Sequence, residues 1–227
     1  MTFSPLSQLE GPWKEAFALA WESYRVGSPA VGAVVVAVDG TVVARGRSRR
    51  GESSAPANHL AGSRLAHAEV NALAQLRVDQ RDGYELYTTL ESCLLCWSAA
   101  CIAGVRRVRF AGADPVWRFT ADLSAVHPVL ADRVHESIGP LTTPIGAWGS
   151  LLPLMERLWR EPGGARVEYF DAAMPALVEL ARRLVADGTA LRFTDLSQEQ
   201  AIELVWDDLV AANDADLNRG RAHNSLR

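Results

Sequence analysis

The sequence predicts an α/β protein, a three-layer α/β/α sandwich around a mixed sheet with a helical C-terminal extension. Up to about residue 120, segments typical of helices and strands alternate, whereas beyond it only helical patterns occur. The chain has 227 residues, of which 48% are hydrophobic, and it is long for one average domain and short for two. We therefore expect a core over residues 1–120 and an extension over residues 121–227.

The first elements are a helix and a β-hairpin. Residues 11–27 carry apolar side chains at three- and four-residue steps and end at Gly27, which predicts a helix. Residues 30–38 form a β-branched run that ends at Asp39-Gly40, and residues 41–47 resume the pattern. This predicts two antiparallel strands with Asp-Gly as the tight turn.

The rest of the core predicts two more helices and two more strands. After a loop rich in Ser, Gly and Arg over residues 48–63, residues 64–78 have helical spacing and residues 84–90 have the composition of a strand. Residues 93–104 have helical composition and end at Gly104, and residues 105–115 predict a strand that leads into an Asp-Pro turn.

The extension predicts three helices, over residues 145–161, 168–188 and 195–213, separated by breaks that contain Gly or Pro. Residues 218–227 are polar, and we expect a frayed tail there.

Net charge and apolar runs limit the classes of partner. The formal net charge of −4 gives no general attraction to nucleic acid, although four arginines form a local basic cluster: Arg45, Arg47, Arg49 and Arg50. This cluster is typical of a solvated strand end, and a phosphate contact is the alternative. The N-terminus has no basic start followed by an apolar run, and no apolar stretch is long enough to span a membrane. We expect a cytoplasmic protein without a membrane segment.

The three cysteines lie close together in the sequence, and two of them have C-x-x-C spacing: Cys93, Cys96 and Cys101. In a reducing compartment this spacing indicates metal or redox chemistry. Cys93 and Cys96 lie three apart in the first turn of a predicted helix, so they share a face, and a helix N-terminus favours thiolates. With His67 they would give the three ligands of a catalytic zinc site, which leaves one position for water.

His67 and Glu69 can meet in one site only under a geometric condition. Residues two apart on a helix point about 200° from each other. They converge if the helix begins at this point and meets the site end-on. Glu69 would then be free to move protons while Val70, Leu73 and Leu76 hold the helix to the sheet.

The combination of these motifs resembles a known family. "HAE" at residues 67–69, followed after an "LYTTLE" strand by C-x-x-C at residues 93–96, is similar to the cytidine deaminase-like superfamily of zinc deaminases. The resemblance covers about residues 10–120 and is strongest to the bacterial nucleobase, nucleoside and deoxycytidylate deaminase-like members.

The resemblance implies that His67, Cys93 and Cys96 bind Zn²⁺ and that Glu69 shuttles protons. It further implies hydrolytic deamination of the exocyclic amine of a free base, nucleoside or nucleotide, most readily of the cytosine or guanine type, with release of ammonia. Because such deaminases commonly assemble, it also implies a homo-oligomer.

Two departures from the family pattern concern the metal helix and the substrate. Relatives have Pro before the first cysteine, where this chain has Ser92, a good N-cap, so we expect the helix to begin at the same place. Relatives often carry an Asn after the second strand that contacts the base or ribose; here Ser48 and Asn58 are the candidates. We add three further candidates for the substrate pocket: His59, Ala68 and Trp117. His59 is alternatively a solvent-facing loop histidine, and Trp117 a packing residue instead of a stacking surface.

Other uses of these motifs are less consistent with the sequence. A structural zinc site needs a fourth Cys or His at its own spacing, which is not evident, and a thioredoxin-like pair does not account for His67 and Glu69. Cys101 lies off the ligand face and is expected to be a small buried apolar residue.

Three alternatives for the function stay open. The first is deamination of adenosine in transfer RNA, which would require a phosphate-binding surface, so the decisive question is whether the arginines of residues 45–50 line the pocket mouth. The second is the deaminase step of riboflavin biosynthesis, whose enzymes have a longer spacing between the two cysteines and usually an attached reductase. The third is a binding module in which the extension blocks the pocket.

Overall fold

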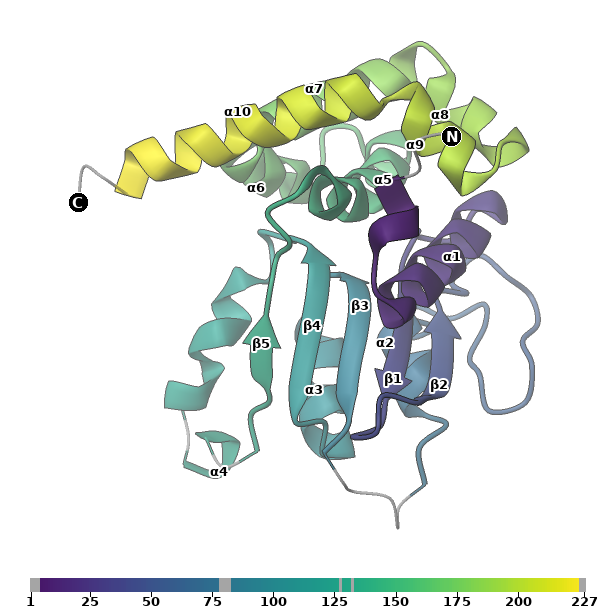
Figure 1. The fold of residues 1–227 in the computed structure, drawn as a ribbon, viewed down its shortest axis with the longest axis vertical. Helices are drawn as coiled ribbons and strands as arrows, with labels where there is room; N and C mark the ends of the chain where they lie inside the picture. Colours follow the sequence, from purple (N-terminus) through teal and green to yellow (C-terminus); the bar gives the residue numbers. More distant parts are fainter. Residues whose placement is uncertain (1–4, 78–82, 127, 132, 225–227) are drawn as a thin grey trace.

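A five-stranded mixed sheet forms the centre of the protein (Figure 1). The computed structural model describes residues 5–77, 83–126, 128–131 and 133–224. Strand β1 is antiparallel to both β2 and β3, whereas β3, β4 and β5 are parallel, in the order β2-β1-β3-β4-β5. The strands are β1 (Gly32–Val36), β2 (Val42–Arg47), β3 (Glu85–Leu90), β4 (Arg107–Gly112) and β5 (Glu136–Ile138).

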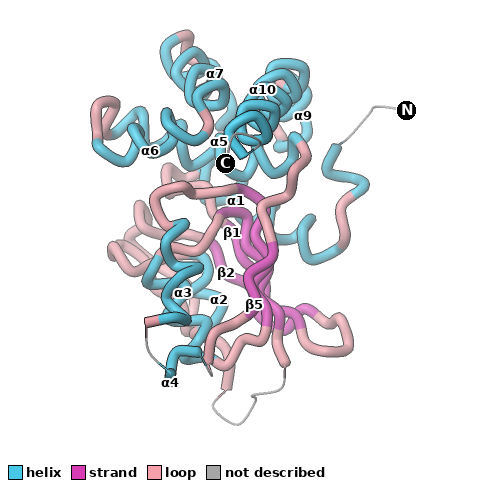
Figure 2. The backbone as a smooth tube through the Cα atoms, turned by 90° about the vertical axis from the view of Figure 1, so that its left-hand side faces the viewer, coloured by secondary structure: helices cyan, strands magenta, loops and turns pink. Residues whose placement is uncertain are grey.

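Helices cover both faces of the sheet, which confirms the predicted three-layer α/β/α fold. Helices α2 (Ala68–Leu73) and α3 (Leu94–Ala103) lie on one face (Figure 2), and α1 (Gly11–Arg25) and α5 (Pro144–Arg160) pack on the other. Successive side chains of β1 point to opposite faces, so Val35 packs toward α2 and Val34 toward α1.

The hairpin between β1 and β2 differs from the predicted two-residue turn. The amide N of Gly40 donates to the carbonyl O of Ala37 at 2.9 Å, and Gly40 has a φ of 87°. The turn therefore spans Val38, Asp39 and Gly40, because the left-handed residue that closes this three-residue loop falls on the glycine.

The chain beyond residue 120 contributes a strand that the sequence analysis missed. Strand β5 has three residues and adds to the edge of the sheet beside β4. Such a short strand carries no alternation long enough to detect.

Helices of the C-terminal part gather at the end of the sheet where β3 and β4 finish (Figure 1). The segment predicted as one helix over residues 168–188 is two helices, because Pro175 has no amide hydrogen and begins the second. The last helix runs to Asn224, so most of the predicted frayed tail is helical, and residues 225–227 lie outside the described residues. The remaining helices are η1 (Pro5–Gln8), η2 (Arg118–Ala125), α4 (Pro128–Ala131), α6 (Ala165–Ala173), α7 (Pro175–Ala186), α8 (Thr189–Arg192), η3 (Phe193–Asp195), α9 (Gln198–Leu204) and α10 (Trp206–Asn224).

One hydrophobic core joins the sheet to these C-terminal helices. Trp21 of α1 stacks on Trp148 of α5 with ring centroids 6.2 Å apart, and Phe193 contacts both rings. Trp148 and Phe193 are fully buried. The C-terminal helices are thus held against the sheet by buried aromatic contacts. Among the described residues, no helix is long and apolar enough to cross a membrane.

Glycine allows α2 to approach the sheet closely. A Cβ atom at Gly46 of β2 would overlap the carbonyl O of Ala68 and the amide N of Ala72, both on α2. The position of α2, and with it the position of Glu69, depends on the absence of a side chain at residue 46.

We predict that Gly46→Ala destabilises the protein and shifts α2 away from β2. Overpacking of this kind costs about 1–3 kcal/mol of unfolding free energy, which thermal or denaturant unfolding would measure. Gly163→Ala is the matched control, since its Cβ would meet no atom within 4 Å. Equal stability of the two variants would contradict the prediction.

Candidate active site

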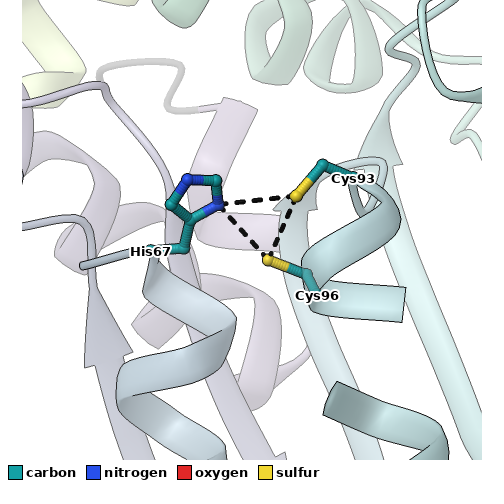
Figure 3. Close-up of side chains that lie close together, drawn as sticks. All are labelled: His67, Cys93 and Cys96. Carbon is teal, nitrogen blue, oxygen red and sulfur yellow. Dashed lines mark hydrogen bonds between the residues drawn. The ribbon is translucent and has the colours of Figure 1, made fainter. Parts of the chain in front are cut away.

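Three potential metal ligands converge between the beginnings of α2 and α3 (Figure 3). The Nδ1 atom of His67 lies 3.5 Å from the Sγ atom of Cys93 and 3.4 Å from that of Cys96. The two Sγ atoms are 3.5 Å apart. The described part of the chain brings no fourth His, Cys, Asp or Glu into this group.

Helix α2 begins where the geometric condition on His67 and Glu69 requires. His67 is the N-cap, with extended backbone at φ −79° and ψ 155°, and α2 starts at Ala68. The residues before it do not continue the helix, because the carbonyl O of Ala66 accepts from the amide N of Arg49 at 3.0 Å. The helix is therefore shorter than the predicted segment 64–78, of which residue 78 lies outside the described residues.

Helix α3 begins one residue later than a Ser92 cap would place it. Cys93 is the N-cap, and the hydroxyl of Ser92 is buried without a hydrogen-bond partner in the described structure. The expectation that Ser92 caps the helix is therefore wrong. The capping position falls on Cys93 itself, and Cys96 lies within the first turn of α3.

The spacing of the three ligand atoms fits a tetrahedral zinc ion. With Zn–S bonds near 2.3 Å and Zn–N bonds near 2.0 Å, tetrahedral ligands are roughly 3.5–3.8 Å apart. The observed separations of 3.4 and 3.5 Å are close to this range. Two sulfurs and one nitrogen are a common donor set for Zn²⁺, and three protein ligands leave one coordination position free.

Burial and hydrogen bonds shift the pKa values of the side chains at this site. The hydrogen bond with Cys96, together with that to His67, lowers the pKa of Cys93 to about 4, against burial. The pKa of Cys96 is raised by the same sulfur contact and by burial. Burial also raises the pKa of Glu69, whose side chain is almost completely enclosed. A carboxyl group whose pKa is raised toward neutral is suited to proton transfer.

A cavity of about 720 Å³ is lined by two of the three ligands, His67 and Cys93. Four of the predicted site residues besides the ligands line it: Ser48, Ala68, Glu69 and Trp117. Ser48 is 2% exposed, and its hydroxyl has no hydrogen-bond partner in the described structure, so it is available to a bound molecule.

Two other candidates lie away from the cavity lining. Asn58 is exposed in the loop before α2 with a φ of 63°. His59 is placed beside the carbonyl oxygens of Ala57 and Arg45, at 3.1 and 3.2 Å from its ring nitrogens. The structure brings neither side chain to the cavity.

The arginines of residues 45–50 are mostly engaged in ion pairs. Arg45 pairs with Glu15 at 2.6 Å, and both Arg47 and Arg49 pair with Glu52, at 2.5 and 2.6 Å. Of the four, only Arg50 lines the cavity. The basic cluster is therefore largely neutralised and does not surround the cavity entrance.

Sequence reasoning missed several charged residues of the cavity. Glu91 and Asp114 follow the ends of β3 and β4, and Arg157 comes from α5. The ends of parallel strands could have suggested Glu91 and Asp114. Arg157 lies in the last turn of α5, an amphipathic helix, and its sequence context gives no signal that it lines a site.

Comparison with known proteins gives a family match for about the first half of the chain. The family model for the cytidine and deoxycytidylate deaminase zinc-binding region matches residues 7–112, which contain all three ligands and Glu69. Residues 7–112, slightly less than half of the chain, are thus similar to the zinc-binding region of these deaminases. The zinc-binding character of this deaminase region and its His-Cys-Cys group identify Zn²⁺ as the cofactor, as predicted.

Two curated proteins resemble the chain in part. A tRNA(Ile)-lysidine synthase of Deinococcus radiodurans is 32% identical over 133 residues, which cover 57% of this chain and 21% of that protein. A tRNA-specific adenosine deaminase of Agrobacterium fabrum is 38% identical over 89 residues, which cover 37% of this chain and 53% of that protein. The chain thus spans about half the length, or less, of these relatives.

A solved structure has the same fold as the deaminase region. It comes from a study of A-to-I editing by tRNA:A34 deaminases at the wobble position of transfer RNA. The match has a TM-score of 0.51 at 24% identity and covers 61% of this chain and 97% of that structure. This likeness agrees with the sheet and helices described above.

We predict that Cys93→Ala loses most of its bound metal. The parent should carry about one zinc ion per chain, and removal of one of three ligands should reduce this strongly. Elemental analysis of the purified protein measures the metal content. Cys101→Ala is the control, because Cys101 lies outside the ligand group and should leave the zinc content unchanged. Full zinc retention in Cys93→Ala would contradict the assignment.

Proposed function

We propose that this protein is a zinc-dependent hydrolytic deaminase that acts on the exocyclic amine of a nucleobase, nucleoside or nucleotide. The observation that carries the proposal is the buried carboxyl of Glu69, which lies beside three ligands for zinc and lines a cavity large enough for such a molecule. The deaminase region matched over residues 7–112 supports it.

His67, Cys93 and Cys96 would hold the metal. A zinc ion with three protein ligands supplies a free position at which the pKa of bound water falls to about 7. Glu69 receives the proton that the water loses and delivers it to a ring nitrogen beside the reacting carbon. Once the water oxygen has bonded to that carbon, Glu69 takes up the remaining proton of the new hydroxyl and passes it to the departing amine, so that one water is consumed, the C–N bond breaks, a carbonyl forms and ammonia leaves.

The cavity walls suit a planar base. Val31, Leu90 and Pro29 provide apolar surface, and Trp117 offers an aromatic face. The unpartnered hydroxyl of Ser48 is available for a hydrogen bond to the base or ribose. The cavity is open beside Glu69, which argues against a binding module whose extension blocks the site.

Deamination of adenosine in transfer RNA is the second candidate. It is favoured by the resemblance to a tRNA-specific adenosine deaminase. The ion-paired state of Arg45, Arg47 and Arg49 and the net charge of −4 weigh against it. We therefore rank a small-molecule substrate of the cytosine or guanine type first. The expected homo-oligomer and cytoplasmic location stay predictions.

We predict that Glu69→Gln lowers kcat by about 100- to 10,000-fold, because the amide cannot shuttle protons. The measurement is ammonia release from cytosine, guanine, adenine, their nucleosides and nucleotides, and transfer RNA. Zinc content should equal that of the parent, since Glu69 is not a ligand. Glu15→Gln on α1, outside the cavity lining, is the control. Parent-like activity in Glu69→Gln would overturn the mechanism, and ammonia from none of these substrates would overturn the function.

A further inference from the structure

Helices α5 and α6, which follow the deaminase region, form one wall of the cavity. Six of their residues or of the link between them line it: Pro153, Glu156, Arg157, Arg160, Glu161 and Arg166. His67 and Glu69 line the same cavity. A molecule whose base reaches Glu69 would therefore have its remaining part beside an arginine-bearing helix surface.

Arg157 is held in a fixed orientation while part of its guanidinium lacks a partner. Its side chain is 18% exposed, and the guanidinium lies over the ring of Phe170, 5.5 Å from the centroid. The nearest carboxylate oxygen, that of Asp114, is 3.8 Å from Nη2. The Nη1 atom is buried and has no hydrogen-bond acceptor in the described structure. A buried, oriented donor without an acceptor is costly unless a ligand satisfies it.

Two more arginines are close enough to repel Arg157. Arg166 lies over the ring of Trp117, 5.8 Å from its centroid, and Arg50 lines the cavity from the loop after β2. Burial lowers the pKa of Arg157, and the charges of Arg166 and Arg50 lower it further, although Asp114 acts in the opposite direction. Like charges that share one cavity repel each other, and an anion between them would relieve this repulsion.

The carboxylates of the cavity leave this positive charge only partly neutralised. Glu156 is ion-paired with Arg160, and Glu91 accepts from the amide N of Asp114 at 3.0 Å. Burial raises the pKa of Asp114, which disfavours its charged form. Glu161 is exposed at the end of α5. Arg50 and Arg166 have no carboxylate partner among the residues that the structure describes.

We propose that Arg157, Arg166 and Arg50 form an anion subsite that binds the phosphate of a nucleoside monophosphate whose base reaches Glu69. This proposal rests on the proposed deaminase function and narrows its substrate to a nucleotide. Guanidinium groups match phosphate oxygens in geometry and charge, and a volume of about 720 Å³ exceeds what a free base needs.

A small phosphate monoester fits this position better than a nucleic-acid backbone. Arg157 lies inside a cavity walled by α5 and α6, whereas a polynucleotide needs an open basic surface on which the strand continues in both directions. The other arginines near β2 are occupied by Glu15 and Glu52.

The test compares nucleoside 5′-monophosphates with the matching nucleosides of cytosine, guanine and adenine. We predict that Arg157→Gln lowers the ratio of kcat/KM for the monophosphate to kcat/KM for the nucleoside by about 10- to 100-fold, as expected for a lost charged hydrogen bond. Arg166→Gln, at an exposed position, should leave folding intact and lower the same ratio. Arg192→Gln on α8, outside the cavity lining, should leave it unchanged.

A purely structural role of Arg157 would lower both kcat/KM values together and leave their ratio unchanged. That result in Arg157→Gln, with no change of ratio in Arg166→Gln, overturns the subsite. Turnover of adenosine in transfer RNA without turnover of any monophosphate also overturns it.

Binding measured without turnover separates this proposal from the proposed function. In zinc-loaded Glu69→Gln, calorimetry with CMP, GMP and AMP should give a Kd about 10- to 100-fold higher once Arg157→Gln is added. If the monophosphates bind in this way and no ammonia is released by the parent, the subsite stands and the deaminase function fails. If nucleosides are deaminated as fast as monophosphates and bind as tightly, the function stands and the subsite fails.

Discussion

The site depends on α2 and α3 beginning at the same end of the sheet. Helix α3 connects the parallel strands β3 and β4, so it must start where β3 finishes, and this places Cys93 and Cys96 at that edge. Helix α2 packs beside α3 on the same face, and its close approach to β2 is possible because residue 46 is glycine. Only with both helix starts at one edge can a histidine and two cysteines approach to within 3.5 Å.

Burial then determines the chemistry available at this edge. Glu69 lines the cavity and is buried, so loss of water disfavours its charged form and raises its pKa. The pKa values of the two cysteines are shifted in opposite directions. The hydrogen bond between them favours the thiolate of Cys93 and disfavours that of Cys96. The same enclosed environment that makes charge costly suits the proton transfer that we propose for Glu69.

The C-terminal helices take part in this environment instead of forming a separate unit beside it. Trp21, Trp148 and Phe193 join α1, α5 and η3 in one core, so α5 cannot move independently of the sheet. Ser150 of α5 also donates to the carbonyl O of Ala113, just after β4, at 2.9 Å. This packing brings Arg157 of α5 to the cavity, where we propose that it binds the substrate's phosphate.

The sequence by itself predicted the order of the helices and strands from α1 to β4, the three candidate ligands and the candidate acid, because these depend on local spacing: "HAE" after a loop, and C-x-x-C after a strand. It also stated the condition under which His67 and Glu69 could share a site, but not that α2 would begin at Ala68. That start, the capping of α3 by Cys93, the addition of β5 and the presence of Arg157 in the cavity were decided by tertiary structure. The start of α2, the pairing of β5 and the place of Arg157 involve contacts between residues far apart in the chain, such as the amide of Arg49 with the carbonyl of Ala66 or Arg157 with Asp114, and no local pattern records such a contact.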